Sequence, residues 1–420
     1  MSELKKEITF WKGIALAVSM VIGSGLLGLP GLALEMGSVH SNAGAWLLIS
    51  VALIPLVYIF ASLGLKFTSS AGLSRYAQES LGDCGNYAVS AVLCGTFTIG
   101  IPVLALIGAD YACTFLGLPQ DSIVWLAIAI LTLSTIGNLL GVKIVNIINT
   151  ASLIALVGMS VVIILSNIPF LMNGFLIFGE TVSGKGDIKY NDLWHISALL
   201  FWAFIGWENL SFSLEEFKHP EKSIPRVYWL SFLIVIFLYM GLTITSIGAQ
   251  VSGVPIKGAS GLASLIGRTP MGFFQMAIMV LVIPANANAW VLGASRLYYA
   301  SGRDHILPSF LGHLSKNGIP LNSLALSFVI YTVVILITCL FKIPLSLLVL
   351  LVSQNFLVLY AFSIFAYWKT ERSVLRWVVT ISASISCGFL LSGFSWWVVY
   401  PLSLLAIGYV GYYRADRKCK

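Results

Sequence analysis

The stretch MVIGSGLLGLPG (residues 20–31) interrupts the first hydrophobic segment of this sequence, and FWAFIGWENLSF (residues 201–212) interrupts a later one. The first is rich in glycine, and the second carries a glutamate, Glu208, within an apolar segment. At membrane depth, a broken helix is tolerated only where its freed backbone groups line a cavity or are buried in protein. A pair of such breaks in two halves of a chain indicates the binding site of a secondary transporter.

The composition excludes a soluble globular protein. Of the 420 residues, 58% are hydrophobic and only 10% are charged, and the mean hydropathy is +0.93. Soluble domains carry about 25% charged residues. Apolar runs of about 20 residues, long enough to cross a bilayer, recur along the chain. They predict twelve spans at about 11–36, 43–66, 84–116, 122–142, 146–166, 192–217, 225–250, 269–299, 321–341, 345–368, 374–393 and 395–413.

The spans predict one polytopic membrane domain over residues 1–420. The longest connection, about 167–191, leaves no room for a soluble domain. Since the two interrupted segments begin spans one and six, we expect an all-α fold with two five-span repeats of opposite orientation. The first repeat covers 1–166, the second covers 192–368, and 374–413 adds two further helices.

The basic residues predict the orientation of the chain, because cytoplasmic loops collect Lys and Arg. With the N-terminus inside, 19 of the 24 basic residues fall on the cytoplasmic side, and five fall outside: Lys185, Lys189, Lys257, Arg268 and Lys342. Both termini are therefore expected in the cytoplasm. The net charge of +7 is explained by this topology and by attraction to lipid headgroups, without nucleic-acid binding. The first apolar run is too long for a signal peptide and lacks a cleavage site.

Residues typical of enzymes and metal sites are scattered. The six cysteines make no CxxC spacing, and the five histidines make no HExxH pattern. We therefore expect no enzyme activity, no cofactor and no metal site. A channel would show no saturable exchange, and a sensor would usually bring a soluble domain.

Two polar loops carry local predictions. A short helix is expected at about Leu73–Leu81. In the loop EEFKHPEKSIPR (residues 215–226), Pro220 and Pro225 are expected to prevent a continuous helix.

The first break is suited to the carboxylate of an amino acid. A helix that restarts after Gly23-Ser24-Gly25 presents free amide donors at its positive end. Glycine allows close approach of a ligand to the backbone. The carbonyls of Val21 and Ile22 can accept from the ammonium group. The alternative is close helix packing of small residues, which the presence of a second break disfavours.

The second break carries Glu208, the residue of the chain that is least favourable inside a membrane. Inserting a carboxylate at mid-membrane costs at least about 2.5 kcal/mol of free energy, so Glu208 is expected to have a function. Burial favours the neutral carboxyl, which would let Glu208 load and release a proton. It could also gate the path by a hydrogen bond to another span, or simply pin the unwound turn. The carbonyls of Phe204 and Ile205, together with Gly206, would complete the ammonium site.

Other polar residues in the spans have two interpretations. Asp110 is either a second proton site or reaches the membrane interface, and we favour the interface. Asn286 and Asn288 lie in IPANANAW (residues 283–290). For both, contact with substrate and hydrogen bonding between helices are equally favoured interpretations. The run Ser353 to Asn355 is expected to face the interior of the scaffold.

The motifs GSGLLGLPG (23–31), SSAGLSRYA (69–77), FWAFIGWEN (201–209), EEFKHPEKSIPR and SGRDHILP (301–308) resemble the amino acid–polyamine–organocation (APC) superfamily of transporters. The resemblance covers the chain end to end and implies the LeuT-like fold with broken helices 1 and 6. It is greatest to bacterial exporters of methionine and branched-chain amino acids. It implies alternating-access transport of small neutral or hydrophobic amino acids across the cytoplasmic membrane, by export or exchange. The alternatives are a proton-coupled importer and an amine or polyamine transporter.

The resemblance also implies roles for individual residues. The substrate carboxylate is placed at Ser24 and Gly25, and Trp202 caps the substrate, where an indole can attract the ammonium group. Trp290 matches a second pathway-lining aromatic residue. The Ser/Thr pair of sodium-coupled relatives and the lysine of sodium-independent relatives are both missing, which favours proton coupling or exchange. The expected partners are the amino acid, a proton and membrane lipids, and a homodimer is an open alternative.

Overall fold

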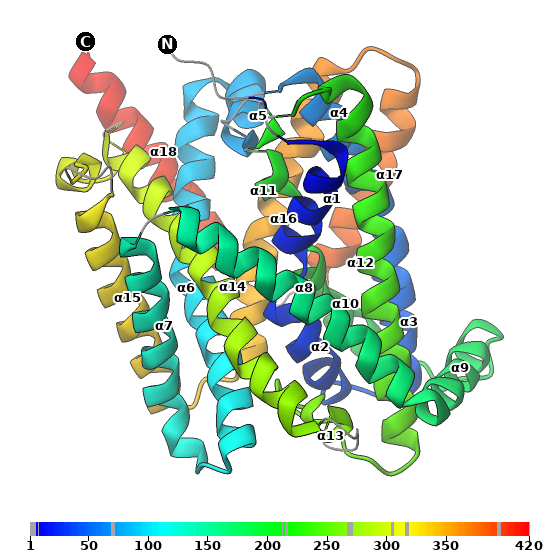
Figure 1. Ribbon diagram of the computed structural model, residues 1–420. Helices are drawn as coiled ribbons and strands as arrows, with labels where there is room; N and C mark the ends of the chain where they lie inside the picture. Colours follow the sequence, from blue (N-terminus) through cyan, green and yellow to red (C-terminus); the bar gives the residue numbers. More distant parts are fainter. Residues whose placement is uncertain are drawn as a thin grey trace.

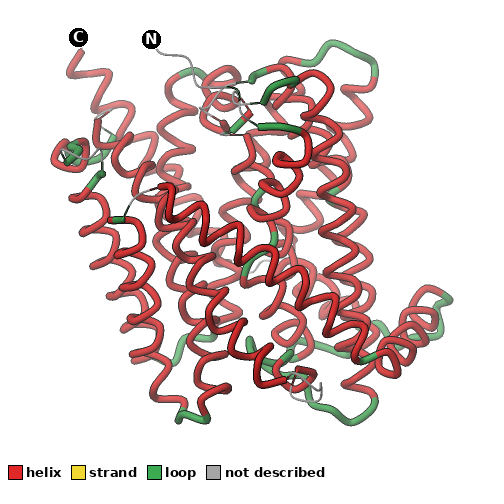
Figure 2. The backbone as a smooth tube through the Cα atoms, in the orientation of Figure 1, coloured by secondary structure: helices red, strands yellow, loops and turns green. Residues whose placement is uncertain are grey.

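The computed structural model describes residues 6, 8–68, 72–140, 142–211, 213–214, 217–266, 272–303, 306–315, 319–392 and 396–419. Every extended regular element in these ranges is a helix, as Figure 2 shows. The exception is a single parallel bridge between Ile8 and Phe217. The predicted all-α class is confirmed.

The helices follow the predicted apolar segments closely. In chain order they are α1 (Phe10–Val21), α2 (Ser24–Leu34), α3 (Val39–Ala52), α4 (Ile54–Lys66), α5 (Gly72–Leu81), α6 (Asp83–Leu116), α7 (Ile123–Leu139), α8 (Val142–Ser166), α9 (Ile168–Val182), α10 (Tyr190–Leu200), α11 (Trp207–Ser211), α12 (Pro220–Val251), α13 (Ala263–Ile266), α14 (Gly272–Arg303), α15 (Leu321–Leu340), α16 (Leu345–Thr370), α17 (Leu375–Ser392) and α18 (Val399–Cys419). Four short 3-10 helices lie within the described residues, among them η2 (Phe201–Phe204). The short helix expected at Leu73–Leu81 is confirmed as α5.

The helices that meet a length and hydropathy criterion for membrane crossing are fewer than the twelve predicted spans. Within the described residues, eight segments are long and apolar enough to cross a membrane. A ninth is added if α8 and α9, which meet at an angle of 84°, are counted together. Each of the twelve predicted spans overlaps at least one helix, but twelve crossings remain a prediction.

Helix α9 was not expected from the sequence. It follows α8 after a sharp bend and projects beside α12 and α3, at the right of Figure 1. Its apolar run is too short to cross a bilayer alone, so a length criterion passes over it. Gly174 of α9 and Gly248 of α12 allow the two helices to approach so closely that a Cβ at either position would overlap the other helix's backbone.

The expectation that Pro220 and Pro225 prevent a continuous helix is wrong. Helix α12 begins at Pro220 and continues through Pro225. Proline is well suited to the first position of a helix, where its missing N–H has no partner to lose. Pro225 lies in the second turn, and the carbonyl that it leaves without an amide partner belongs to exposed Glu221.

The long helix α6 lies at the centre of one side of the bundle. It packs against α7, α14, α16 and α18. One continuous cluster of buried apolar side chains connects it to α1, α2 and the segment from α10 to α11. The chain enters α1 and leaves α18 at the same end of the molecule, at the top of Figure 1.

Candidate functional site

The two predicted breaks lie where the sequence placed them, and they touch each other. Helix α1 ends at Val21 and α2 starts at Ser24, while α10 and η2 are separated from α11 by Ile205 and Gly206. A Cβ at Gly206 would lie 2.4 Å from the carbonyl oxygen of Met20. The unwound turns of two segments almost 200 residues apart in sequence are therefore in direct backbone contact.

The first break leaves backbone groups free in both directions. Ile22 is extended, with ψ of 113°, and its N–H still bonds to the carbonyl of Val18. The first amides of α2 have no acceptor within that helix, and the last carbonyls of α1 have no donor within theirs. The break therefore presents a partial positive charge from α2 beside a partial negative charge from α1. The side chain of Ser24 lies outside the described parts of the structure.

The second break depends on a backbone conformation that glycine favours. Gly206 has φ of +132°, which side-chain-bearing residues rarely adopt. Ile205 before it is extended, and its N–H bonds to the carbonyl of Trp202 at 3.3 Å. Gly206 is required both by this angle and by its contact with Met20.

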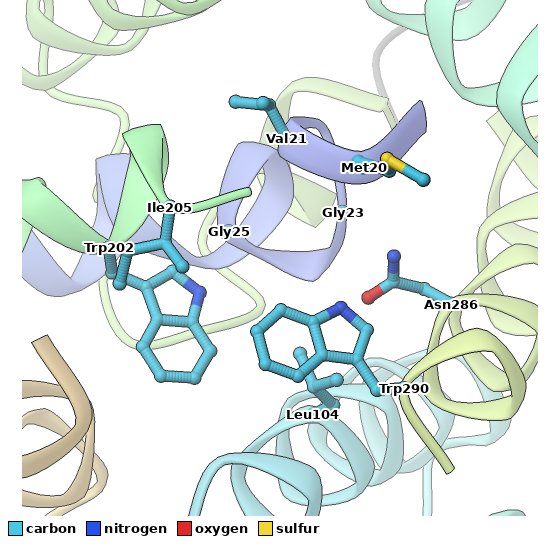
Figure 3. Close-up of a pocket in the computed structure, with 9 residues that line it drawn as sticks. All are labelled: Met20, Val21, Gly23, Gly25, Leu104, Trp202, Ile205, Asn286 and Trp290. Atoms are coloured by element: carbon cyan, nitrogen blue, oxygen red, sulfur yellow. The ribbon is translucent and has the colours of Figure 1, made fainter. Parts of the chain in front are cut away.

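A narrow cavity lies between these breaks, and Figure 3 shows its lining side chains. The indoles of Trp202 and Trp290 are parallel within 4°, with their ring centroids 6.4 Å apart. Most of the remaining lining is apolar or backbone. The full lining is Met20, Val21, Gly23, Gly25, Leu104, Trp202, Ile205, Asn286 and Trp290.

Gly25 makes room for the indole of Trp202. A Cβ at position 25 would lie 2.9 Å from Cδ1 of Trp202 and 3.2 Å from the hydroxyl of Tyr239. The ring of Trp202 therefore packs onto the start of α2, beside the free amides. Trp290 is held from the other side by edge-on contacts with Phe97 and Phe356.

Glu208 lies beside the break, and its contacts are backbone and hydroxyl groups. Its side chain is 1% exposed. Oε2 accepts hydrogen bonds from the N–H of Gly206 at 3.1 Å and from the hydroxyl of Tyr360 at 2.7 Å. Oε1 has no hydrogen-bond partner within the described residues. The carboxyl group thus connects the second break to α16 and keeps one oxygen free.

The two asparagines of α14 have different environments. Asn138 of α7 donates to the carbonyl of Asn288 at 3.0 Å and to its Oδ1 at 2.6 Å, so Asn288 joins two helices. Asn286 lines the cavity instead, and its amide lies against Gly23.

Asp110 lies away from this cavity. Its Oδ2 accepts a hydrogen bond from the N–H of Ser260 at 3.0 Å, which ties α6 to the loop after α12. The same loop packs on α2, since a Cβ at Gly31 would lie 2.1 Å from the carbonyl oxygen of Gly258. Asp110 therefore fixes a loop that covers α2.

Apart from Ser24 and Asp110, the predicted site residues fall into two groups. Val21, Gly23, Gly25, Trp202, Ile205 and Trp290 line the cavity, while Ile22, Phe204, Gly206 and Glu208 are close in the chain but do not line it. Phe204 is fully buried against Trp46 and Tyr239.

The sequence did not predict three residues of this site: Met20 and Leu104 line the cavity, and Tyr360 bonds to Glu208. Met20 lies directly before the break, so its position in the sequence could have indicated it. Leu104 and Tyr360 lie within long apolar helices and carry no local signal. The run Ser353 to Asn355 is fully buried, as expected for the scaffold interior.

The broken helices, the cavity between them and the membrane-spanning helices define an integral membrane protein with an internal cavity. Residues 8–412 match the family model described as "Amino acid permease". The chain belongs to the amino acid permease family, and it is a multi-pass membrane protein.

Similar proteins agree with this family. The chain is 28% identical to the uncharacterized amino acid permease YecA of Bacillus subtilis, over 97% of this chain and 96% of the relative. It is 23% identical to the L-methionine/branched-chain amino acid exporter YjeH of Escherichia coli, again over 97% and 96%. The human cystine/glutamate transporter is 24% identical over 75% of this chain and 65% of its own length.

Proposed function

We propose that this protein is a secondary active transporter that moves small neutral or hydrophobic amino acids by alternating access. The observation that carries the proposal is the contact between the two breaks at Gly206 and Met20, with a cavity directly beside it. The break in α1 offers free amides for a carboxylate and free carbonyls for an ammonium group. A free α-amino acid carries both groups on one carbon.

The lining of the cavity supports a neutral or apolar side chain on the substrate. No acidic or basic side chain belongs to the described lining, which is dominated by Leu104, Ile205 and the two indoles. A cationic or anionic side chain would therefore lose its hydration without gaining a partner. This argument disfavours the alternative of a polyamine substrate.

The direction of transport is proposed as export or exchange across the cytoplasmic membrane. Support comes from YjeH, whose name describes an exporter of methionine and branched-chain amino acids. The start of α1 and the end of α18 lie on the same side of the bundle, which agrees with an even number of crossings and two cytoplasmic termini. In this proposal the chain forms two inverted repeats, and the segments α1–α2 and α10–α11 move against the scaffold.

A proton is proposed as the coupling ion, with Glu208 as its carrier. The support is a buried carboxyl group next to the second break, with one oxygen that has no hydrogen-bond partner among the described residues. Protonation of Oε1 would leave both bonds to Oε2 in place. Loading the proton therefore needs no rearrangement of Tyr360 or Gly206.

The experiment is flux of labelled leucine in proteoliposomes with and without an imposed pH gradient. We expect a gradient to drive leucine against its own concentration difference. A leucine flux that is the same with and without the pH gradient would contradict proton coupling. The absence of any amino acid flux would contradict the transport proposal itself.

A further inference from the structure

The cavity contains one amide side chain among groups that are otherwise apolar, indole or backbone. Among the lining residues, Asn286 alone carries a side-chain amide or carboxyl group. In Figure 3 this amide extends from α14 toward the break in α1 and the ring of Trp290. A single polar group in an apolar pocket usually fixes the orientation of a ligand.

The oxygen of that amide makes no hydrogen bond within the described part of the structure. Oδ1 of Asn286 is buried and accepts no hydrogen bond from any described residue. A buried acceptor without a partner destabilises a protein, so native structures rarely keep one without a reason. Asn288, one helical step further, has its oxygen bonded to Asn138 at 2.6 Å. The helix therefore carries one asparagine for packing and one with an unused acceptor in the cavity.

The position of Asn286 decides which ligand group it meets. A Cβ at Gly23 would lie 2.7 Å from both Oδ1 and Nδ2 of Asn286, so the amide lies against the end of the break. The last carbonyls of α1, just before Gly23, form the negative end of a helix dipole and favour a cation. An acceptor oxygen beside them adds to a site for a positively charged donor.

We propose that Oδ1 of Asn286 accepts a hydrogen bond from the ammonium group of the transported amino acid. This inference rests on the proposed function and adds to it a residue that selects for the amino group. The ammonium group then lies between the end of α1 and α14, while the carboxylate lies at the start of α2. Such an acceptor discriminates an amino acid from the corresponding carboxylic acid.

The test compares leucine with two analogues that each lack one charged group. 4-Methylpentanoate lacks the amine, and 3-methylbutylamine lacks the carboxylate. The variant Asn286→Leu keeps the shape of the side chain but removes the acceptor. Counterflow in proteoliposomes gives the half-saturation concentration for leucine, and competition gives an inhibition constant for each analogue.

For Asn286→Leu we expect a 10- to 100-fold rise in the leucine half-saturation concentration, about the value of a hydrogen bond to a charged group. The inhibition constant of the amine should rise in parallel, and that of 4-methylpentanoate should change less than about threefold. Equal weakening of leucine and 4-methylpentanoate would overturn the inference. So would an unchanged affinity for leucine.

Two further variants test the inference independently of whether Asn286→Leu folds. Asn286→Ser retains an acceptor oxygen and should retain part of the preference for leucine over 4-methylpentanoate, even if Asn286→Leu does not fold. Asn288→Leu is the matched control, and it should lower thermal stability without changing that preference. If the unmodified protein shows no leucine counterflow, the proposed function fails. If it does and the preference is unchanged in both Asn286 variants, only this inference fails.

Discussion

The hydroxyl of Tyr360 donates a hydrogen bond of 2.7 Å to Oε2 of Glu208, across 152 positions of sequence. This bond joins α16 to the short helix after the second break. The same oxygen accepts from the N–H of Gly206, so the break and the scaffold helix share one acceptor atom. A movement of α11 away from α16 must break or replace this bond.

Replacing Tyr360 by phenylalanine removes this donor and keeps the ring, which packs edge-on against Phe60 and Phe201. We expect Tyr360→Phe to lower the free energy of unfolding by about 1–3 kcal/mol, because a buried carboxyl group loses a partner. Tyr239→Phe is the control, since the Tyr239 hydroxyl is buried without a partner in the described structure. Thermal unfolding in detergent distinguishes them, and equal loss in both variants would contradict the assigned role of the bond.

Replacing Glu208 by glutamine tests the proton role. Glutamine is neutral at every pH, so Glu208→Gln should flatten the pH dependence of leucine transport between about pH 5 and 9. Asp110→Asn should leave that dependence unchanged, because Asp110 bonds to the amide of Ser260 and does not line the cavity. An unaltered pH profile in Glu208→Gln would refute proton loading, although a gating role could remain.

Much of this arrangement follows from local sequence. Glycines that interrupt a helix and a glutamate among apolar residues both raise the free energy of membrane insertion. Such residues therefore indicate a function, and they are recognisable in the sequence alone. Both breaks are therefore predictable from the sequence. Helix α5 is predictable because its polar residues separate two apolar segments.

The remaining features depend on partners that are distant in sequence or on helix orientation. Tyr360 is one aromatic residue among many until α16 is placed beside α11. Asn286 and Asn288 are indistinguishable by type, but two positions on a helix differ by about 200°, so only one of them can face the cavity. Which one does so depends on the rotation of α14. Pro225 is a case where the local prediction fails: proline disfavours a helix interior, but α12 continues through this residue.

Gly206 is the residue where the two breaks meet, and it tolerates no side chain. Alanine at this position would have an unfavourable φ and a Cβ 2.4 Å from the carbonyl oxygen of Met20. We expect Gly206→Ala to lower the free energy of unfolding by about 2 kcal/mol or more and to abolish transport. Gly158→Ala, with no atom within 4 Å of its Cβ, should be neutral or slightly stabilising. A stable, active Gly206→Ala protein would contradict the observed contact.

Gly25 borders the free amides of α2. Gly25→Leu would push into the indole of Trp202 and fill the proposed carboxylate position, so leucine binding should be lost while expression is retained. Gly28→Ala, whose Cβ would have ordinary contacts of 3.5 Å with Ile107, should bind as the unmodified protein does. Equilibrium binding of labelled leucine in detergent compares the two, and intact affinity in Gly25→Leu would exclude this backbone site.

Counterflow tests the central claim most directly. Proteoliposomes are loaded with unlabelled leucine or methionine, and a trace of labelled leucine is added outside, without any ion gradient. A saturable carrier that uses the cavity between α1–α2 and α10–α11 should accumulate label transiently, and Gly25→Leu should abolish the accumulation. If none of the twenty amino acids produced counterflow in the unmodified protein, the account of an amino acid carrier would be contradicted.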